Sequence, residues 1–294
     1  MHQEESKEIL VNREIVYVLG KFIGSGAQGD AYQLIRKDTG EVFICKVNKS
    51  QDDLESAREE AQRLKQYHHK NIVRYVDNFI QNLGFRTHYL IMENCSGGEL
   101  RGFIKENSAK KENTEVYIKY FSDIVEGLAE IHGRGEMHRD MKPENVFILI
   151  TGKSAIEHVM KLGDFGLFRK VDKTLMTAAS KGVGTPAYMS PEQHKLESYG
   201  PSSDVWAAGV ILYEMFAGYH PFQTVKDIKK NPPAQLPEYV PKDVKELLAN
   251  LLEKDPTKRM KISEIQSWLF LRKQTAKVPQ AGNVDKDETA GLKA

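Results

Sequence analysis

Near the middle of this 294-residue chain lies the stretch Met137-His138-Arg139-Asp140-Met141-Lys142-Pro143-Glu144-Asn145, and Asp164-Phe165-Gly166 follows it after a loop. The two pieces supply two carboxylates, Asp140 and Asp164, and one amide, Asn145. Carboxylate and amide oxygens suit a hard cation such as Mg²⁺, and a carboxylate can also hold a nucleophile. The stretch therefore indicates a site at which a nucleophile and metal ions meet.

Two further pieces lie upstream, the turn Gly24-Ser25-Gly26-Ala27-Gln28-Gly29 and a strand that ends in Phe43-Ile44-Cys45-Lys46. Glycines let backbone N–H groups approach phosphates without a clash at Cβ. The residues after the turn, 30–34, have the pattern of a strand, whereas a dinucleotide-binding turn needs a helix at that point. The pattern predicts a strand-turn-strand lid over phosphates, with an ordinary β-hairpin as the alternative.

Lys46 ends an apolar strand, where an ammonium group needs a partner. A helix is predicted over residues 52–67, with Asp52 or Asp53 as its cap. Its apolar face consists of Leu54, Ala57, Ala61 and Leu64. Glu60 shares that inward face, whereas Glu59 points about 100° away from it. We expect Glu60 to pair with Lys46 and to orient it toward the α- and β-phosphates of a nucleotide; an unpaired surface lysine is the alternative.

The pattern of apolar residues divides the chain into two lobes of an α+β fold. Residues 15–47, 72–79 and 88–92 alternate as strands of a twisted antiparallel sheet, which the helix over 52–67 joins. Helices are predicted over 114–133, 205–217, 244–251 and 263–271. We expect a flexible N-terminus (1–12), a small lobe (13–92), a hinge (93–98), a helical lobe (99–275) and a disordered tail (276–294).

Composition limits the classes of partner. The formal net charge is +1, so no overall field draws the chain to nucleic acid or to an acidic membrane. The most apolar stretch, Trp206 to Ala217, is too short to span a bilayer core of about 30 Å. Two cysteines in a chain of this size, Cys45 and Cys95, indicate a reduced intracellular protein. We expect a soluble, cytoplasmic protein that binds neither nucleic acid nor a membrane.

From about Tyr17 to Leu271 the chain resembles the eukaryotic protein kinases, since the pieces quoted above stand in the order and spacing of that family. The resemblance implies a bilobal fold with ATP between the lobes, Mg²⁺ as the cofactor and a protein substrate. Its alternative is a pseudokinase, which would bind a nucleotide or act as a scaffold without transferring phosphate.

The same resemblance implies a role for each residue of the central stretch. Asp140 would be the catalytic base or would orient the substrate hydroxyl, and Lys142 would steady the γ-phosphate. Asn145 and Asp164 would bind Mg²⁺, while Gly166 would let the metal-binding loop turn.

Nucleotide contacts are also implied by the resemblance. Catalysis would need Lys46 and Glu60, and backbone groups of Glu93 and Cys95 would bond the adenine edge above Phe147. The full implied set is Ile23, Gly24, Gly26, Gly29, Ala31, Ile44, Lys46, Met92, Glu93, Cys95 and Phe147.

Within the kinases, Lys142 and Gly184-Thr185-Pro186 resemble the serine/threonine class. Met92 at the gatekeeper position, Phe147 and Gly163 resemble the NIMA-related (NEK) group. That resemblance alone adds a cytoskeletal or nuclear location as an alternative. The sequence leaves the substrate and the oligomeric state open.

Two structural pairs are expected by the same resemblance. Glu192 would be buried against Arg259, and Asp204 would accept hydrogen bonds from the backbone near His138. The chain between Pro221-Phe222 and Leu236-Pro237 is several residues shorter than in typical kinases, and Asn231-Pro232-Pro233 would end the helix there early.

Departures from the family pattern concern control more than chemistry. Ala31 is smaller and Ile44 larger than the residues usually found over adenine, so the pocket keeps its volume with a changed shape. Lys181 stands where a phosphoacceptor is usual, so either another residue takes that role, namely Ser180, Thr177 or Thr174, or the loop orders without phosphate. Phe168 would either clamp an inactive loop or pack on the helical lobe.

Overall fold

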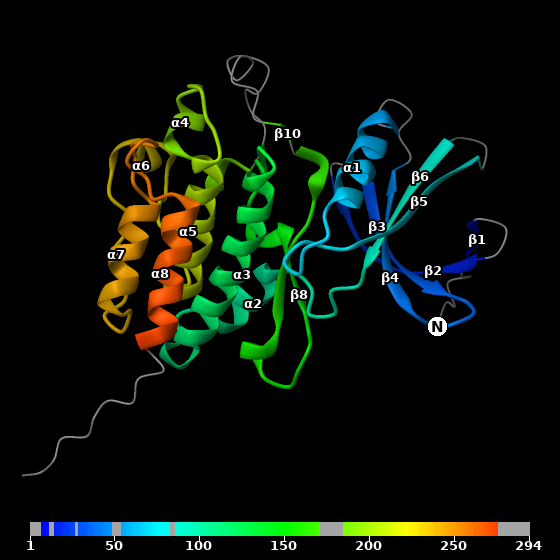
Figure 1. Ribbon diagram of the computed structural model, residues 1–294, viewed down its shortest axis with the longest axis horizontal. Helices are drawn as coiled ribbons and strands as arrows, with labels where there is room; N and C mark the ends of the chain where they lie inside the picture. The colour runs from blue at the N-terminus through cyan, green and yellow to red at the C-terminus, as the bar shows by residue number, and fades with distance from the viewer. Residues whose placement is uncertain are drawn as a thin grey trace, which may run out of the picture.

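A computed structural model describes residues 7–11, 15–26, 29–48, 54–82, 86–167, 169–170 and 185–275. The chain forms a small lobe built on one sheet and a larger lobe built of helices, which lie side by side in Figure 1. The predicted α+β bilobal fold is confirmed.

The small lobe contains six antiparallel strands in the order β1-β2-β3-β4-β6-β5. Their bounds are β1 (Lys7–Val11), β2 (Ile15–Gly26), β3 (Gly29–Arg36), β4 (Val42–Asn48), β5 (Tyr75–Asn82) and β6 (Arg86–Glu93). Alternate residues of β2, β3, β4 and β6 point into one apolar cluster that includes Leu34, Phe43, Cys45 and Ile91. Helix α1 (Leu54–Gln66) covers the sheet with the face predicted from its period, since Leu54, Ala57, Glu60, Ala61 and Leu64 are all buried.

Two expectations about strands were wrong. Residues 7–11, assigned to the flexible N-terminus, form β1 and pair with β2, because Ile9, Leu10 and Val11 favour a strand despite the polar residues around them. The strand expected over 72–79 begins at Tyr75 instead. The backbone before it is used elsewhere, since Val73 N donates to Leu162 O (2.9 Å) and Leu162 N to Asn71 O (2.9 Å).

The helical lobe is built around α5 (Ser202–Ala217), which is buried at every position from Ser203 to Ala217. The helices around it are α2 (Leu100–Asn107), α3 (Thr114–Gly133), α4 (Pro191–His194), α6 (Val225–Lys230), α7 (Lys242–Leu251) and α8 (Ile262–Thr275). Helix α6 has six residues and ends directly before Asn231-Pro232-Pro233, as predicted. None of the helices within the described ranges is long and apolar enough to cross a membrane.

Short strands and turns carry the central stretch. Strand β7 (Glu136–Met137) pairs with β10 (Arg169–Lys170), and β8 (Val146–Leu149) pairs with β9 (Val159–Leu162). The 3₁₀ turns are η1 (Lys111–Asn113), η2 (Pro143–Asn145), η3 (Ala155–Glu157), η4 (Phe165–Leu167) and η5 (Pro186–Tyr188). The two halves of the central motif, 137–145 and 164–166, therefore flank the β8–β9 hairpin.

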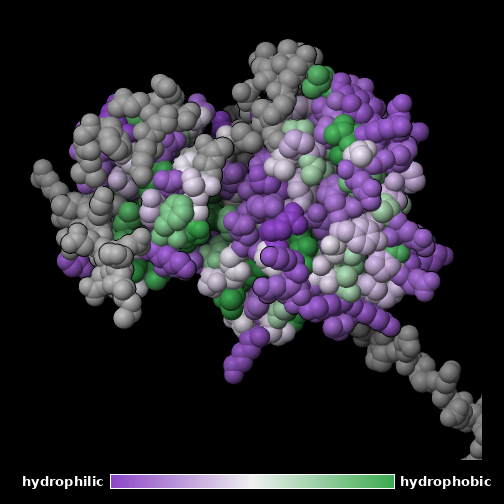
Figure 2. Space-filling view, turned by 180° about the vertical axis from the view of Figure 1, so that it is seen from behind, coloured by the Kyte–Doolittle hydropathy of each residue, from purple (hydrophilic) through white to green (hydrophobic). Residues whose placement is uncertain are grey.

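The outer surface is mixed in polarity. Figure 2 shows the face opposite to that of Figure 1, where hydrophilic side chains cover most of the helical lobe and hydrophobic ones form small separate patches.

Burial raises the pKa of the Cys45 and Cys95 thiols to about 12, so both stay protonated at neutral pH.

Several predictions fall outside the described residues. They concern the cap at Asp52 or Asp53, the loop residues Phe168, Thr174, Thr177, Ser180, Lys181 and Gly184, and the tail over 276–294.

Candidate active site

Lys46 and Glu60 meet at the centre of the small lobe. The Nζ atom of Lys46 on β4 lies 2.8 Å from Oε1 and 2.9 Å from Oε2 of Glu60 on α1. Glu59 instead lies at the surface, where it pairs with Arg63. Burial would lower the pKa of Lys46, but the nearby carboxylates more than offset this and the net pKa is raised. The predicted pair is therefore present, with the lysine charged.

Asp164 connects this pair to the helical lobe. Its Oδ1 atom lies 3.4 Å from Lys46 Nζ. Its φ of 59° is in the left-handed region, which a residue with a side chain seldom adopts. The next residue, Phe165, is buried under α1 with its ring 5.4 Å from that of Tyr67. The packing of Phe165 thus fixes the turn that holds the Asp164 carboxylate near Lys46.

Asp140 is the most heavily bonded carboxylate of the central stretch. Lys142 Nζ donates to its Oδ2 (2.7 Å), and the backbone N and Oγ1 of Thr185 both donate to its Oδ1 (2.9 and 3.0 Å). Asn145 Nδ2 donates to its Oδ2 (3.1 Å) and to its carbonyl (2.7 Å). Burial would raise the pKa of Asp140, but the Lys142 ammonium more than offsets this and the net pKa is lowered. Asp140 is therefore ionised and can accept a hydrogen bond from a hydroxyl.

Thr185 was missed as a site residue by the sequence reasoning. It entered there only as part of Gly184-Thr185-Pro186, a marker of the serine/threonine class, although it bonds both Asp140 and Lys142 (Nζ to Oγ1, 2.9 Å). No local pattern signals this contact, because Thr185 lies 45 residues after Asp140 in the chain.

Asp204 on α5 holds the backbone of the central stretch, residues 137–145. Asp204 accepts hydrogen bonds from the N–H groups of His138 and Arg139, each at 2.9 Å, as predicted. Burial lowers the pKa of His138 and keeps its ring neutral, so its Nε2–H donates to Gly163 O at 3.0 Å. The Asp140 loop and the Asp164 loop are thus joined through one buried histidine.

A nucleotide could be held between these loops and the glycine-rich hairpin. Strand β2 continues to Gly26 and β3 begins at Gly29, so the predicted strand-turn-strand arrangement is present and a strand, not a helix, follows the turn. A Cβ at Gly29 would lie 2.5 Å from Val47 O, and its φ is 135°, so only glycine fits there. Gly24 has no atom within 4 Å of an added Cβ, which leaves space above it. Ile23 is half exposed.

The residues expected around adenine lie on neighbouring strands. In the sheet register Ala31 is opposite Lys46, and Ile44 is opposite Met92. Glu93 N donates to Arg74 O (3.0 Å), which leaves the Glu93 carbonyl as the group that would bond a base. Cys95 is buried.

The expected adenine floor, Phe147, lies on β8. A Cβ on Gly163 would lie 2.6 Å from its ring. Phe147 and Gly163 are therefore closely packed side by side.

The two expected metal ligands have suitable chemistry. Asn145 uses its amide nitrogen to bond Asp140, which directs its amide oxygen elsewhere, and Asp164 offers a carboxylate. Across the described ranges, no three His, Cys, Asp or Glu side chains form a metal-binding group. A site with two protein oxygen ligands suits Mg²⁺, which keeps several waters or phosphate oxygens in its coordination shell.

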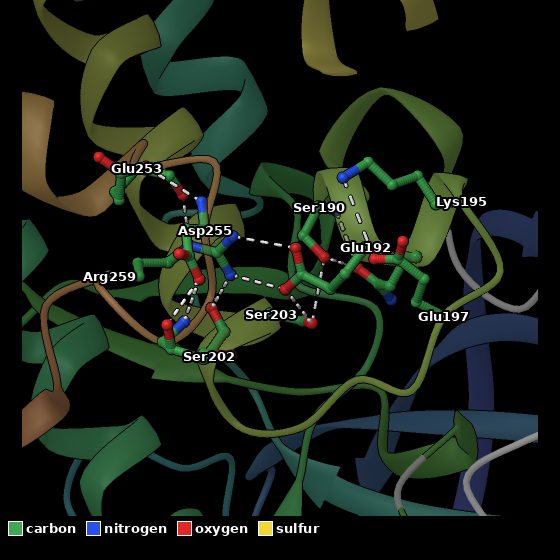
Figure 3. Close-up of polar contacts among 11 residues, drawn as sticks. Ser190, Glu192, Lys195, Glu197, Ser202, Ser203, Glu253, Asp255 and Arg259 are labelled. Atoms are coloured by element: carbon green, nitrogen blue, oxygen red, sulfur yellow. Dashed lines mark hydrogen bonds and ion pairs between the residues drawn. The ribbon is translucent and has the colours of Figure 1, made fainter. Parts of the chain in front are cut away.

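A buried ion pair supports the site from the helical lobe, as predicted. Arg259 donates to both oxygens of Glu192, at 2.7 and 2.9 Å. Dashed lines mark these bonds in Figure 3. The guanidinium also donates to the carbonyls of Ser202 and Glu253, each at 2.9 Å. This pair ties α4, which follows Thr185 closely in the chain, to the segment before α8.

Comparison with known proteins shows which family the chain resembles. A family model described as "Protein kinase domain" matches residues 17–271. A probable serine/threonine-protein kinase nek2 of Dictyostelium discoideum is 33% identical over 85% of this chain and 61% of its own length. Mouse serine/threonine-protein kinase Nek3 is 32% identical over 83% of this chain and 47% of its own length. Human Nek2 is 30% identical over 86% of this chain and 58% of its own length. The chain thus spans about half the length of these relatives.

Proposed function

This chain belongs to the protein kinase domain family, and on that premise we propose that it transfers the γ-phosphate of Mg-ATP to serine or threonine hydroxyls of proteins. The observation that carries the proposal is the position of ionised Asp140 between Lys142 and Thr185, on the loop that His138 joins to Asp164.

Each residue of the candidate site then has a definable role. Asp140 accepts a hydrogen bond from the acceptor hydroxyl and orients it toward the phosphorus atom. Lys142 lies 2.7 Å from Asp140 and places a positive charge where the transferred group passes. Lys46, oriented by Glu60, binds phosphate oxygens. Mg²⁺ held by Asn145 and Asp164 would offset the charge of those oxygens.

A pseudokinase is the competing function. The replacements in the activation loop and in the adenine roof favour it. Against it, all the expected catalytic groups are present and bonded within the site, namely Lys46, Glu60, Asp140, Lys142, Asn145 and Asp164. The named relatives are serine/threonine-protein kinases, which supports phosphate transfer to the same two hydroxyl residues. A cytoplasmic location remains a prediction from the sequence.

The test is transfer of labelled γ-phosphate to a generic basic protein in the presence of Mg-ATP. Asp140→Asn should lower the rate about 10²-fold or more, since it removes the charge that orients the hydroxyl. Glu246→Gln changes an exposed carboxylate on α7 and should leave the rate unchanged. No transfer by the wild type, or equal rates for wild type and Asp140→Asn, would favour the scaffold instead.

Activation of the enzyme is a separate question. Arg139, the residue that would bind a loop phosphate, donates to the hydroxyl of Tyr199 at 2.7 Å. The two hypotheses stand as before: phosphorylation of Ser180, Thr177 or Thr174, or order without phosphate. Mass spectrometry after incubation with Mg-ATP, together with alanine at all three positions, separates them, because full activity of the triple variant excludes phospho-activation through these residues.

A further inference from the structure

A buried hydrogen bond between Tyr67 and Glu136 joins the small lobe to the helical lobe. Tyr67 directly follows the last residue of α1, and its hydroxyl donates to Glu136 Oε2 at 2.7 Å. Glu136 belongs to β7 and stands directly before the motif that contains Asp140. Tyr67 is 3% exposed and Glu136 is 9% exposed. A carboxylate buried to this extent needs a donor, and the Tyr67 hydroxyl supplies it.

The ring of Tyr67 also contacts the Asp164 loop. Its centroid lies 5.4 Å from that of Phe165, the residue after Asp164. The guanidinium of Arg134 lies over the Tyr67 ring, 4.7 Å from its centroid. Burial and the charge of Glu136 raise the pKa of Tyr67, so the phenol stays protonated and can donate. One side chain at the end of α1 thus contacts both the Asp164 loop and β7.

The bond lies at the end of α1 about which the helix would turn. The backbone of residues 71–73, which follow Tyr67, is bonded to β9, so this end of the helix is anchored to the helical lobe. A motion that keeps the anchor is a rotation of α1 about this end, and it separates the Tyr67 hydroxyl from Glu136. The same rotation moves Glu60, about 10 Å farther along the helix, away from Lys46.

We propose that the Tyr67–Glu136 hydrogen bond holds α1 in the inward position, at which Glu60 pairs with Lys46, and that Tyr67 is thereby a positioning residue of the candidate active site. With α1 inward, Glu136 is buried and depends on the Tyr67 hydroxyl; with α1 turned outward, water replaces that donor. Loss of the hydroxyl therefore destabilises the inward position selectively. The inference rests on the proposed function and names a contact that would order the site without a loop phosphate.

Acylation of Lys46 by acetic anhydride measures the position of α1 without relying on phosphate transfer. An amine reacts only in its uncharged form, and pairing with Glu60 keeps Lys46 charged and largely buried. Tyr67→Phe retains the ring beside Phe165 and removes the hydroxyl. Because a hydrogen bond to a buried charge is lost, the acylation rate of Lys46 in nucleotide-free protein should rise about tenfold by mass spectrometry.

Two further variants separate the position of α1 from general stability. Tyr67→Phe/Glu136→Leu leaves no buried charge without a donor, so its acylation rate at Lys46 should return to within about threefold of the wild type. Tyr213→Phe is the matched control, since it removes the hydrogen bond from another buried tyrosine to Ala234 O (2.8 Å), within the helical lobe. It should leave the rate at Lys46 unchanged.

Three results would overturn the inference and leave the proposed function intact. They are equal rates at Lys46 in the wild type and in Tyr67→Phe, an equal rise in Tyr213→Phe, and a double variant that reacts as fast as Tyr67→Phe. A wild type that shows the expected acylation pattern but transfers no phosphate would refute the proposed function and leave the role of Tyr67 in holding α1.

Discussion

Replacing Arg259 by methionine should remove a large part of the stability of this protein. The side chains of Arg259 and Glu192 are 0% and 1% exposed, and two hydrogen bonds of 2.7 and 2.9 Å join them. Methionine has a similar length and no charge, so the variant fills most of the space but leaves the Glu192 carboxylate buried and unpaired.

The size of the loss follows from that geometry. Removing one partner of a buried ion pair costs about 3–5 kcal/mol. The carbonyls of Ser202 and Glu253 also lose their donor, which places the cost toward the upper end of that range. Since domains unfold with about 5–15 kcal/mol, the variant should lose a third or more of its stability.

The pH dependence of the free energy of unfolding is a second test of the Arg259–Glu192 pair. Burial would raise the pKa of Glu192, but Arg259 more than offsets it and the net pKa is lowered. The stabilisation by the pair is therefore present above about pH 4.3, the pKa of an unfolded glutamate, and is lost as the pH falls through the lower folded value. In Arg259→Met the guanidinium is gone and only weaker hydrogen bonds, such as that from Ser203 Oγ, oppose burial. We therefore expect the folded pKa of Glu192 to lie above the unfolded one, so that the variant gains stability as the pH falls. Its deficit relative to the wild type should narrow in acid.

Urea denaturation at pH 7 and at acid pH measures both effects. The double variant Arg259→Met/Glu192→Gln should recover about 1–3 kcal/mol, because Ser203 Oγ, 3.1 Å from Glu192 Oε1, can still bond the amide. Lys242→Met is the matched control, since Lys242 and Glu246 form a surface pair that is 91% and 65% exposed, and it should change stability by less than about 1 kcal/mol. If Arg259→Met costs no more than this control, the reasoning from burial is refuted.

Three other variants test the nucleotide side of the site. Lys46→Met should abolish phosphate transfer, measured in the same assay as Asp140→Asn, and retained transfer would show that the pair on α1 does not position the nucleotide. Ala31→Val should overpack the adenine roof and weaken ATP binding, whereas equal or tighter affinity by calorimetry would show that the pocket has spare room. Gly163→Ala places a Cβ 2.6 Å from the Phe147 ring and should lower stability by about 1–3 kcal/mol in thermal melts. Gly133→Ala, with no atom within 4 Å, is its neutral control, and equal losses in both would contradict the packing argument.

The local sequence pattern was sufficient to predict a contact where the residue lies on a regular helix or strand. The period of α1 placed Glu60 on the inner face and Glu59 on the outer one, and the structure has them so. The same local logic failed at residues 72–74, because their apolar side chains look like a strand while their backbone bonds Leu162, far along the chain. A sequence pattern describes burial of a segment and does not say which neighbour buries it.

The sequence by itself determined the proposed chemistry of this protein, because each proposed catalytic group is identified by its type and spacing, as with Asp140, Lys142 and Asn145. Tertiary structure alone decided the contacts of Arg101 and of Thr185, whereas the pairs Lys46–Glu60 and Arg259–Glu192 were expected beforehand. Arg101 bonds Glu144 and Glu214, which stand 43 and 113 residues after it, and Thr185 bonds Asp140 from 45 residues away. The contacts of Arg101 depend on the packing of α2 against η2 and α5, and no period of 2 or 3.6 residues extends over any of these separations.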